Sequence, residues 1–465
     1  LQELLILRGS SLIGLGENEE GKNLIISLIP EIKDESRRQS LQAEVASAEF
    51  TLTNFDSSFR TCMQVISNSK TNAEDKGKCY NLLGLIELYK NNNFTEALNH
   101  IQQALEIYQH KDNLLRAAIM EMNMGNIYNM KGEHEKAEQC WNKSLEINLK
   151  IGNLEQEAML LQNFGIYNYD KSNFDKAIEF YKEATVIFLS LGNKNGECSV
   201  LLNLGEIFLK VCQYQEAFES LINAENILNH LSNSFLEFES LVILSKLYYE
   251  VGDYKHLNDV IVKFKKLYEE GNVVEKNKIQ FDYMVELEKI KNDLLSVDLN
   301  QLHTLQIKFL DQSDKTNYFE TTIWLVKYLL AQNKFGDALA ELSTKQVSEF
   351  CNENLLFSAE REYMFGKISE NDQNSDLKSS IEYYNAAFEA INELSVTELT
   401  WKILFELGNY FYQRGNYSKA RENFKYSKEI IYYFGDNIKN HQLRDAFFNK
   451  PERKEALMKI DKLGV

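Results

Sequence analysis

The sequence predicts an all-α protein, a superhelical solenoid of about eleven helical hairpins that ends in a C-terminal capping helix. Three observations predict this fold. Only two prolines, Pro30 and Pro451, occur in 465 residues, so the long interior lacks the residue that breaks helices most strongly. Glycines recur 40 residues apart at Gly125, Gly165 and Gly205. Linkers rich in glycine or serine are absent from the sequence. We therefore expect one continuous array in which each repeat packs on its neighbours.

Each of these glycines begins the same ladder of residue types. An alanine follows twelve positions later, a bulky residue four positions after that, and a small residue three positions further on. Glycine inside a helix costs about 1 kcal/mol relative to alanine, so its recurrence in helical sequence indicates that two helices pass close together. The clear copies are Gly125, Ala137, Trp141 and Ser144; Gly165, Ala177, Tyr181 and Ala184; Gly205, Ala217, Leu221 and Ala224; and Gly408, Ala420, Phe424 and Ser427.

Weaker copies extend the array in both directions, and turn signals such as Gly132 and Gly415 separate the helices. We expect the solenoid to span residues 1–434, with its clearest repeats at 78–230 and 401–434 and its most degenerate part around 270–312. A capping helix or tail is expected over 435–465, because the end of an array needs a polar outer face. In chain order the weaker copies are Gly9 with Gly21, Ala46 with Ser58, Ser245 with Leu257, Val326 with Ala338, and Gly366 with Ala387; Gly84, Ala97 and Ala104 follow the ladder with one extra residue in the turn.

Charge and cysteine usage limit the classes of function. The chain has 51 basic and 69 acidic residues and a formal net charge of −18, which argues against nucleic acid and favours apolar or basic partners. No apolar run reaches the roughly 20 residues that span a bilayer, so we expect no membrane association. The six cysteines include no CxxC pair, which favours a reducing, cytoplasmic location. Because the chain starts at Leu1 rather than at methionine, we expect it to be part of a longer protein.

The repeat resembles the tetratricopeptide repeat (TPR) family. The segments Met124–Tyr128 and Leu204–Phe208 carry the family's glycine and its aromatic residue three positions later, and the alanine, bulky and small positions follow in the family's order. The period of 40 exceeds the usual length of about 34, and the closing proline is missing. The chain is therefore most similar to the long-helix subgroup of kinesin light chains and of bacterial signalling proteins. The resemblance implies a right-handed superhelix and a non-catalytic protein- or peptide-binding scaffold, the sensory or regulatory region of a larger protein in signal transduction.

The resemblance also implies where a ligand binds. In the family, the first helix of each hairpin lines a concave groove, and the residue two positions before the signature glycine faces it; here these residues are Asn123, Asn163 and Asn203. An asparagine amide both donates and accepts, so a ladder of three can pair with the backbone of an extended peptide. The alternative is that each asparagine forms a helix–helix hydrogen bond within the scaffold. The same register places in the groove Asn81, Met122, Asn126, Met130, Met159, Gln162, Tyr169, Leu202, Glu206 and Lys246, with core packing as the alternative for each methionine.

No constellation for catalysis or metal binding stands out. The seven histidines are scattered without HExxH spacing, and the carboxylates are spread evenly, as on solvated helix faces. We expect no enzymatic activity, no metal and no cofactor. A second hypothesis is a receptor for a small molecule or signal peptide that controls transcription or an attached effector domain. A closed pocket with convergent polar groups favours this receptor, whereas an open groove counts against it.

Overall fold

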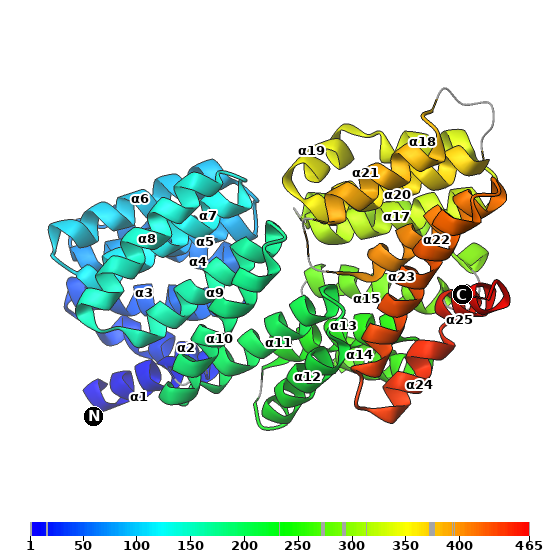
Figure 1. The fold of residues 1–465 in the computed structure, drawn as a ribbon. Helices are drawn as coiled ribbons and strands as arrows, with labels where there is room; N and C mark the ends of the chain where they lie inside the picture. Colours follow the sequence, from blue (N-terminus) through cyan, green and yellow to red (C-terminus); the bar gives the residue numbers. More distant parts are fainter. Residues whose placement is uncertain are drawn as a thin grey trace. The chain divides into compact units, whose positions relative to one another are not determined.

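The chain folds into paired helices, as the computed structural model shows (Figure 1). Over the described residues all regular structure is helical, so the all-α prediction is confirmed. The chain divides into two compact units, Leu1–Asn163 and Phe164–Val465, with the boundary inside α9 (Leu154–Asp170). Within the same residues, no helix is both long and apolar enough to cross a bilayer. The described residues are 2–14, 17–231, 233–270, 275–290, 294–312, 314–371, 377–392, 394 and 396–464.

The first unit contains four complete hairpins and the N-terminal part of α9. A short 3₁₀ helix, η1 (Ile29–Glu31), follows the first hairpin, and Pro30 lies in it, where its missing N–H leaves no α-helical bond unmade. The hairpins are α1 (Gln2–Gly14) with α2 (Asn18–Leu28), α3 (Glu35–Thr51) with α4 (Phe55–Ser67), α5 (Ala73–Tyr89) with α6 (Phe94–His110), and α7 (Leu114–Met130) with α8 (His134–Ile151).

The second unit continues the pattern with seven hairpins, which gives eleven hairpins over the described residues, the number that the sequence predicts. The 3₁₀ helix η2 (Leu294–Ser296) lies within the stretch predicted to be most degenerate. The hairpins are the C-terminal part of α9 with α10 (Phe174–Leu191), α11 (Lys194–Lys210) with α12 (Tyr214–Leu228), α13 (Ser234–Val251) with α14 (Tyr254–Glu270), α15 (Glu275–Ile290) with α16 (Leu299–Asp311), α17 (Lys315–Ala331) with α18 (Phe335–Leu342), α20 (Leu355–Asn371) with α21 (Ser380–Ile391), and α22 (Glu398–Gln413) with α23 (Tyr417–Asp436).

Three helices lie outside this pairing. A short helix that the sequence does not predict, α19 (Lys345–Glu353), separates α18 from α20. Two helices, α24 (His441–Asn449) and α25 (Pro451–Lys462), occupy the tail where one capping helix is expected. The break between them has a local cause: Pro451 disfavours helical backbone at Lys450, whose φ of −57° and ψ of 127° are not helical. The same proline then starts α25, where its missing N–H leaves no helical bond unmade.

The glycine ladder lies where the two helices of a hairpin approach each other. A Cβ atom added to Gly125 would lie 2.4 Å from the indole ring of Trp141, and one added to Gly165 would lie 2.3 Å from the ring of Tyr181. Both distances are far below van der Waals contact, so only glycine fits beside these rings. This confirms the close approach that the ladder predicts. Gly205 meets Leu221, Gly366 meets Tyr384 and Gly408 meets Phe424 in the same way.

The small residue at the end of the ladder has a polar role in two copies. Ser144 Oγ donates to the carbonyl oxygen of Ala118 at 2.7 Å, and Ser427 Oγ donates to that of Trp401 at 3.0 Å. Both serines are fully buried, so each hydrogen bond satisfies a hydroxyl that would otherwise destabilise the core. A serine or alanine at this position therefore keeps the two helices close without leaving an unpaired group.

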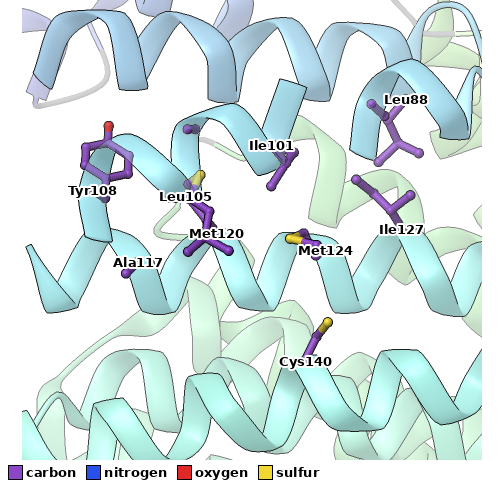
Figure 2. Packing of buried hydrophobic residues seen from close by; sticks show 11 residues of the cluster. Leu88, Ile101, Leu105, Tyr108, Ala117, Met120, Met124, Ile127 and Cys140 are labelled. Atoms are coloured by element: carbon purple, nitrogen blue, oxygen red, sulfur yellow. The ribbon is translucent and has the colours of Figure 1, made fainter. Parts of the chain in front are cut away.

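Apolar side chains of neighbouring hairpins pack into shared hydrophobic clusters. In the first unit, Ile101 and Leu105 of α6 pack with Met120, Met124 and Ile127 of α7 (Figure 2). These residues are all buried, and burying each such side chain stabilises the fold by about 1.5–3 kcal/mol. The contact joins one hairpin to the next, as a stacked array requires.

The turns repeat with the same period of 40 residues. Left-handed backbone ends a first helix at Asn92, Gly132, Ser172, Cys212 and Gly252, each 40 residues after the last. Only two of these five residues are glycine, because the reversal requires the left-handed conformation and not a particular side chain. The second turn of each repeat carries an asparagine N-cap at the same period, at Asn113, Asn153, Asn193 and Asn233.

Candidate functional site

In the second unit, segments far apart in sequence meet and enclose a cavity of about 390 Å³. Asn354, before α20, donates to the carbonyl oxygen of Asp170 at 3.2 Å and accepts from Ser172 Oγ at 3.0 Å. Tyr214, at the start of α12, donates its hydroxyl to Glu398 of α22 at 2.9 Å. These contacts join residues more than 180 positions apart, so distant hairpins of this unit meet around a partly open cavity.

The cavity wall consists mainly of first helices. Helices α11, α13, α15, α17, α20 and α22 all begin their hairpins and all contribute side chains, while α25 contributes Glu452 and Ala456. The apolar part of the wall combines aliphatic and aromatic side chains, which suits contact with a ligand that has both apolar and polar groups. Its aromatic residues include Tyr249, Tyr283, Trp324, Tyr363, Trp401 and Phe405.

A cluster of charges centred on Glu320 lies on one side of the cavity. Lys210 Nζ donates to Glu320 Oε1 at 2.6 Å, Lys246 Nζ lies 3.6 Å from Oε2, and the Tyr283 hydroxyl donates to Oε2 at 3.1 Å. Burial opposes ionisation, but the two ammonium groups prevail and lower the pKa of Glu320 to about 2. Burial likewise favours the neutral amine of Lys210, yet the Glu320 carboxylate raises its pKa above the usual value. The cluster is therefore charged at neutral pH.

A second set of ion pairs fixes α25 against the cavity. Lys402 of α22 lies 3.1 Å from Glu452, and this ammonium group lowers the pKa of the carboxyl. Arg453, which is 1% exposed, donates through Nη2 to Glu398 at 2.6 Å and lies 3.8 Å from the centre of the Phe447 ring. The C-terminal helix therefore forms part of the cavity and is more than a polar cap.

The predicted asparagines form inter-repeat hydrogen bonds within the first unit. Asn123 of α7 donates to Asn81 Oδ1 of α5 at 3.0 Å, and Asn163 of α9 donates to Asn126 Oδ1 of α7 at 2.9 Å. Trp141 Nε1 donates to the same oxygen of Asn126 at 2.9 Å. These bonds match the scaffold alternative, and each amide is only partly buried, which keeps it within reach of a ligand. Ligand contact by this ladder stays a prediction.

The other predicted groove residues divide by burial. Met122 and Leu202 are 5% and 1% exposed and pack in the core, where a ligand does not reach them. Met130 and Met159 are 43% and 39% exposed. Glu206 and Lys246 line the cavity of the second unit. Partly buried positions are held by Gln162, Tyr169 and Asn203.

The sequence analysis does not identify most of the residues that line the cavity, although the spacing of the repeat points to several of them. The rule that singles out Asn203 takes the residue two positions before the signature glycine. Applied to Val285 in the degenerate stretch, to the weaker copies at Val326 and Gly366 and to the clear copy at Gly408, the same rule gives Tyr283, Trp324, Met364 and Glu406, and all four line the cavity. At Val285 and Val326 a valine replaces the signature glycine, which hides these two copies of the repeat.

Comparison with known families agrees with the repeat structure. Two family models, both described as tetratricopeptide repeat, match residues 77–111 and 116–189. None of the curated proteins compared with this chain matches it.

Several solved structures are similar at low identity. BtubC (BKLC) from P. vanneervenii is 17% identical, with 50% of this chain and 92% of BtubC covered and a TM-score of 0.36. The apo form of RapI is 15% identical, with 63% and 99% covered and a TM-score of 0.44. A tetratricopeptide repeat protein from Parabacteroides merdae is 12% identical, with 61% and 98% covered and a TM-score of 0.40. With TM-scores below 0.5, we base no conclusion on these similarities.

Proposed function

Because the chain belongs to the tetratricopeptide repeat family through its repeats at 77–111 and 116–189, we propose that it binds a short segment of a partner protein, or a peptide, in the cavity of its second unit. Stacked hairpins of this type are protein-binding scaffolds that present their first helices to a ligand. The observation that carries the proposal is the cavity itself, which those helices line with aromatic and charged groups. Its volume of about 390 Å³ lies within the roughly 300–1,000 Å³ range of sites for small ligands.

The convergence of polar groups on the partly open cavity also supports the receptor hypothesis for a small molecule or signal peptide. Polar groups from several helices converge on the cavity, among them Lys246, Glu320 and Lys402. A flat docking surface for a folded partner needs no such convergence. We therefore propose a small or extended ligand in place of a folded domain.

The asparagine ladder is a second candidate surface, in the first unit. Asn123 and Asn163 each use one amide N–H in an inter-repeat bond, and each amide has a second N–H and a carbonyl oxygen. We propose that these groups hold the backbone of an extended segment. We propose the same role for Asn203 within the second unit.

The cellular role follows as a proposal from the family and the composition. We propose a sensory or regulatory part of a larger signalling protein that acts in the cytoplasm. The six cysteines are free and buried, which supports a reducing compartment, and the net charge of −18 supports partners that are not nucleic acid. Co-purification of the full-length protein with its partner tests this role.

Affinity selection from a synthetic pentapeptide library, read by mass spectrometry, tests the cavity. Ala456→Phe fills the cavity from α25, and Trp324→Ala removes part of its wall. Both variants are expected to reduce retention of the selected peptides by about tenfold or more, since each removes contacts worth over 1.4 kcal/mol. Tyr433→Ala, at an exposed position on α23 that does not line the cavity, is the matched control.

Circular dichroism of each variant separates lost binding from lost folding. Equal retention by the wild type and by folded Ala456→Phe contradicts binding in the cavity. The variant with Asn123, Asn163 and Asn203 all changed to alanine tests the ladder in the same assay: a loss of retention with helicity intact supports it, and unchanged retention removes it.

A further inference from the structure

Lys327 and Glu360 are charged side chains of the cavity that lie outside its ion pairs. Lys210 and Lys246 share Glu320, and Lys402 pairs with Glu452. Among the residues that the structure describes, Lys327 and Glu360 have no partner of opposite charge within 4 Å, although both line the cavity. They lie on α17 and α20, the first helices of successive hairpins, which contact each other.

Lys327 projects beside an aromatic ring. Its ammonium nitrogen lies 4.2 Å from the centre of the Trp324 ring, which is within the range of a cation–π interaction. Burial lowers the pKa of Lys327, and repulsion from Lys402 lowers it further. An anionic group of a ligand beside Lys327 would stabilise the charged ammonium form that burial disfavours.

Glu360 is an acidic residue whose charged form is also disfavoured by burial. Burial raises its pKa, against the attraction of Lys327, Lys210 and Lys402. Its carboxylate oxygens can accept hydrogen bonds from a cation that enters the cavity.

A charge that is removed from water and left without a partner destabilises a fold, and the cost falls when a ligand supplies the partner. Apart from Glu206, the other charged residues of the wall form ion pairs with one another or with residues nearby, so Lys327 and Glu360 are positions in the wall that a charged ligand can complete. Trp324 lies three residues before Lys327 on α17, Tyr363 lies three residues after Glu360 on α20, and both offer apolar surface to the cavity.

We propose that the cavity binds a short peptide that carries one acidic and one basic group, with the acidic group at Lys327 and the basic group at Glu360. The inference rests on the proposed function and adds the chemistry of the ligand. The sequence predicts an apolar or basic partner. The inference adds that the ligand must also carry an anionic group. Opposite charges fix the direction in which the peptide lies, since reversing it would place like charges together.

A pentapeptide library with acetylated and amidated ends tests the inference, because its charges come only from side chains. Peptides that contain both an acidic and a basic residue are expected to be enriched on the wild type about tenfold over peptides with one charge or none, given the strength of hydrogen bonds to charged groups. Lys327→Gln should abolish the preference for the acidic residue and keep the preference for the basic residue. Glu360→Gln should abolish the preference for the basic residue and keep the preference for the acidic residue. A parallel library with free ends shows whether a terminal carboxylate or amine replaces either side chain.

Matched control variants are Lys425→Gln and Glu429→Gln, a charged pair on the exposed face of α23. They should leave both preferences unchanged. The inference is overturned if Lys327→Gln and Glu360→Gln retain the same peptides as the wild type while Ala456→Phe retains none, an outcome that leaves the proposed function standing. If folded Ala456→Phe retains the same peptides as the wild type, the proposed function fails as well.

Discussion

Trp141 and Gly125 show how single residues set the geometry of a hairpin. The indole ring occupies the place that any side chain at position 125 would need, and its Nε1 donates to Asn126 one residue further along α7. Asn126 in turn accepts from Asn163, so a packing contact within one repeat is linked to a hydrogen bond with the next. The ladder therefore fixes both the approach of two helices and the alignment of successive repeats.

Gly125→Ala is expected to lower the free energy of unfolding by about 1–2 kcal/mol. Overpacking against Trp141 costs about 1–3 kcal/mol, and the better helix propensity of alanine offsets up to about 1 kcal/mol. Denaturant unfolding followed by circular dichroism measures the difference. Gly14→Ala is the control, because a Cβ at Gly14 meets nothing within 4 Å. If the two variants are equally stable, the ladder glycines have no packing role.

The ionisation of Glu320 is expected to make the stability of the protein depend on pH. Its pKa of about 2 in the fold lies below the ordinary value of 4.5, so its ionised form stabilises the protein above about pH 4.5, and that stabilisation is lost as pH falls towards 2. Glu320→Gln is therefore expected to lower the free energy of unfolding by about 2 kcal/mol at pH 7, where it leaves Lys210 and Lys246 without their carboxylate. The gap between the wild type and the variant should narrow between pH 4.5 and pH 2.

Urea unfolding of both proteins at pH 7, 4 and 3 measures that gap. Glu429→Gln, at an exposed position, serves as the control for acid effects elsewhere in the chain. A gap of the same size at pH 7 and pH 3 would contradict the role of the Glu320 charge.

At the scale of elements, the C-terminal helices are held by contacts with much earlier parts of the second unit. Gln215 of α12 accepts through Oε1 from the backbone N–H groups of Lys439 and Asn440, and Lys450 donates to the backbone of Glu250 at 3.1 Å. Arg453 reaches Glu398 and the hydroxyl of Tyr214. The tail therefore connects the second and later hairpins of this unit in addition to covering its last one.

Arg453→Met is expected to lower the free energy of unfolding of the second unit by about 3–5 kcal/mol, because it leaves the buried Glu398 carboxylate without its partner. It should also release α24 and α25, so limited proteolysis is expected to cut near residues 437–440. The control is Arg444→Met, since Arg444 pairs with Asp436 at the surface, where an ion pair contributes less than about 1 kcal/mol. Equal effects of the two variants would show that the buried pair does not hold the tail.

At the scale of the molecule, the chain is an array of eleven hairpins over the described residues, in two compact units. In such arrays each repeat is stabilised mainly by its neighbours, so different parts can unfold at different denaturant concentrations. The cysteines report on both units, because each has three that are buried and free. Cys62, Cys79 and Cys140 belong to the first unit, and Cys198, Cys212 and Cys351 to the second.

We expect none of these thiols to react in the native protein and the two sets to become reactive at different urea concentrations. Burial raises the pKa of Cys140, Cys198 and Cys351 to about 11, so few thiolates are present at neutral pH. Pulsed alkylation followed by mass spectrometry measures each site. A single midpoint for all six cysteines would show that the units unfold together.

The sequence by itself determined the hairpins and their number. Small residues at fixed spacing mark the close approach of two helices, and that requirement acts between neighbours in sequence, so Gly125, Ala137 and Trp141 reveal it directly. The turns were only partly visible, because Ser172 and Cys212 take up the left-handed conformation that a glycine would announce. The break between α24 and α25 could have been read from Pro451, whose effect on the preceding residue is local.

The cavity of the second unit is visible only in the tertiary structure. The same is true of the charges in it that have no ion pair. Asp170 meets Asn354, and Tyr214 meets Glu398 and Arg453, because small rotations between successive hairpins add up over several repeats. No local pattern specifies that sum. The partner of Lys210 is Glu320, which lies 110 residues away, so the separation of Lys327 and Glu360 from the ion pairs emerges only when the repeats are stacked.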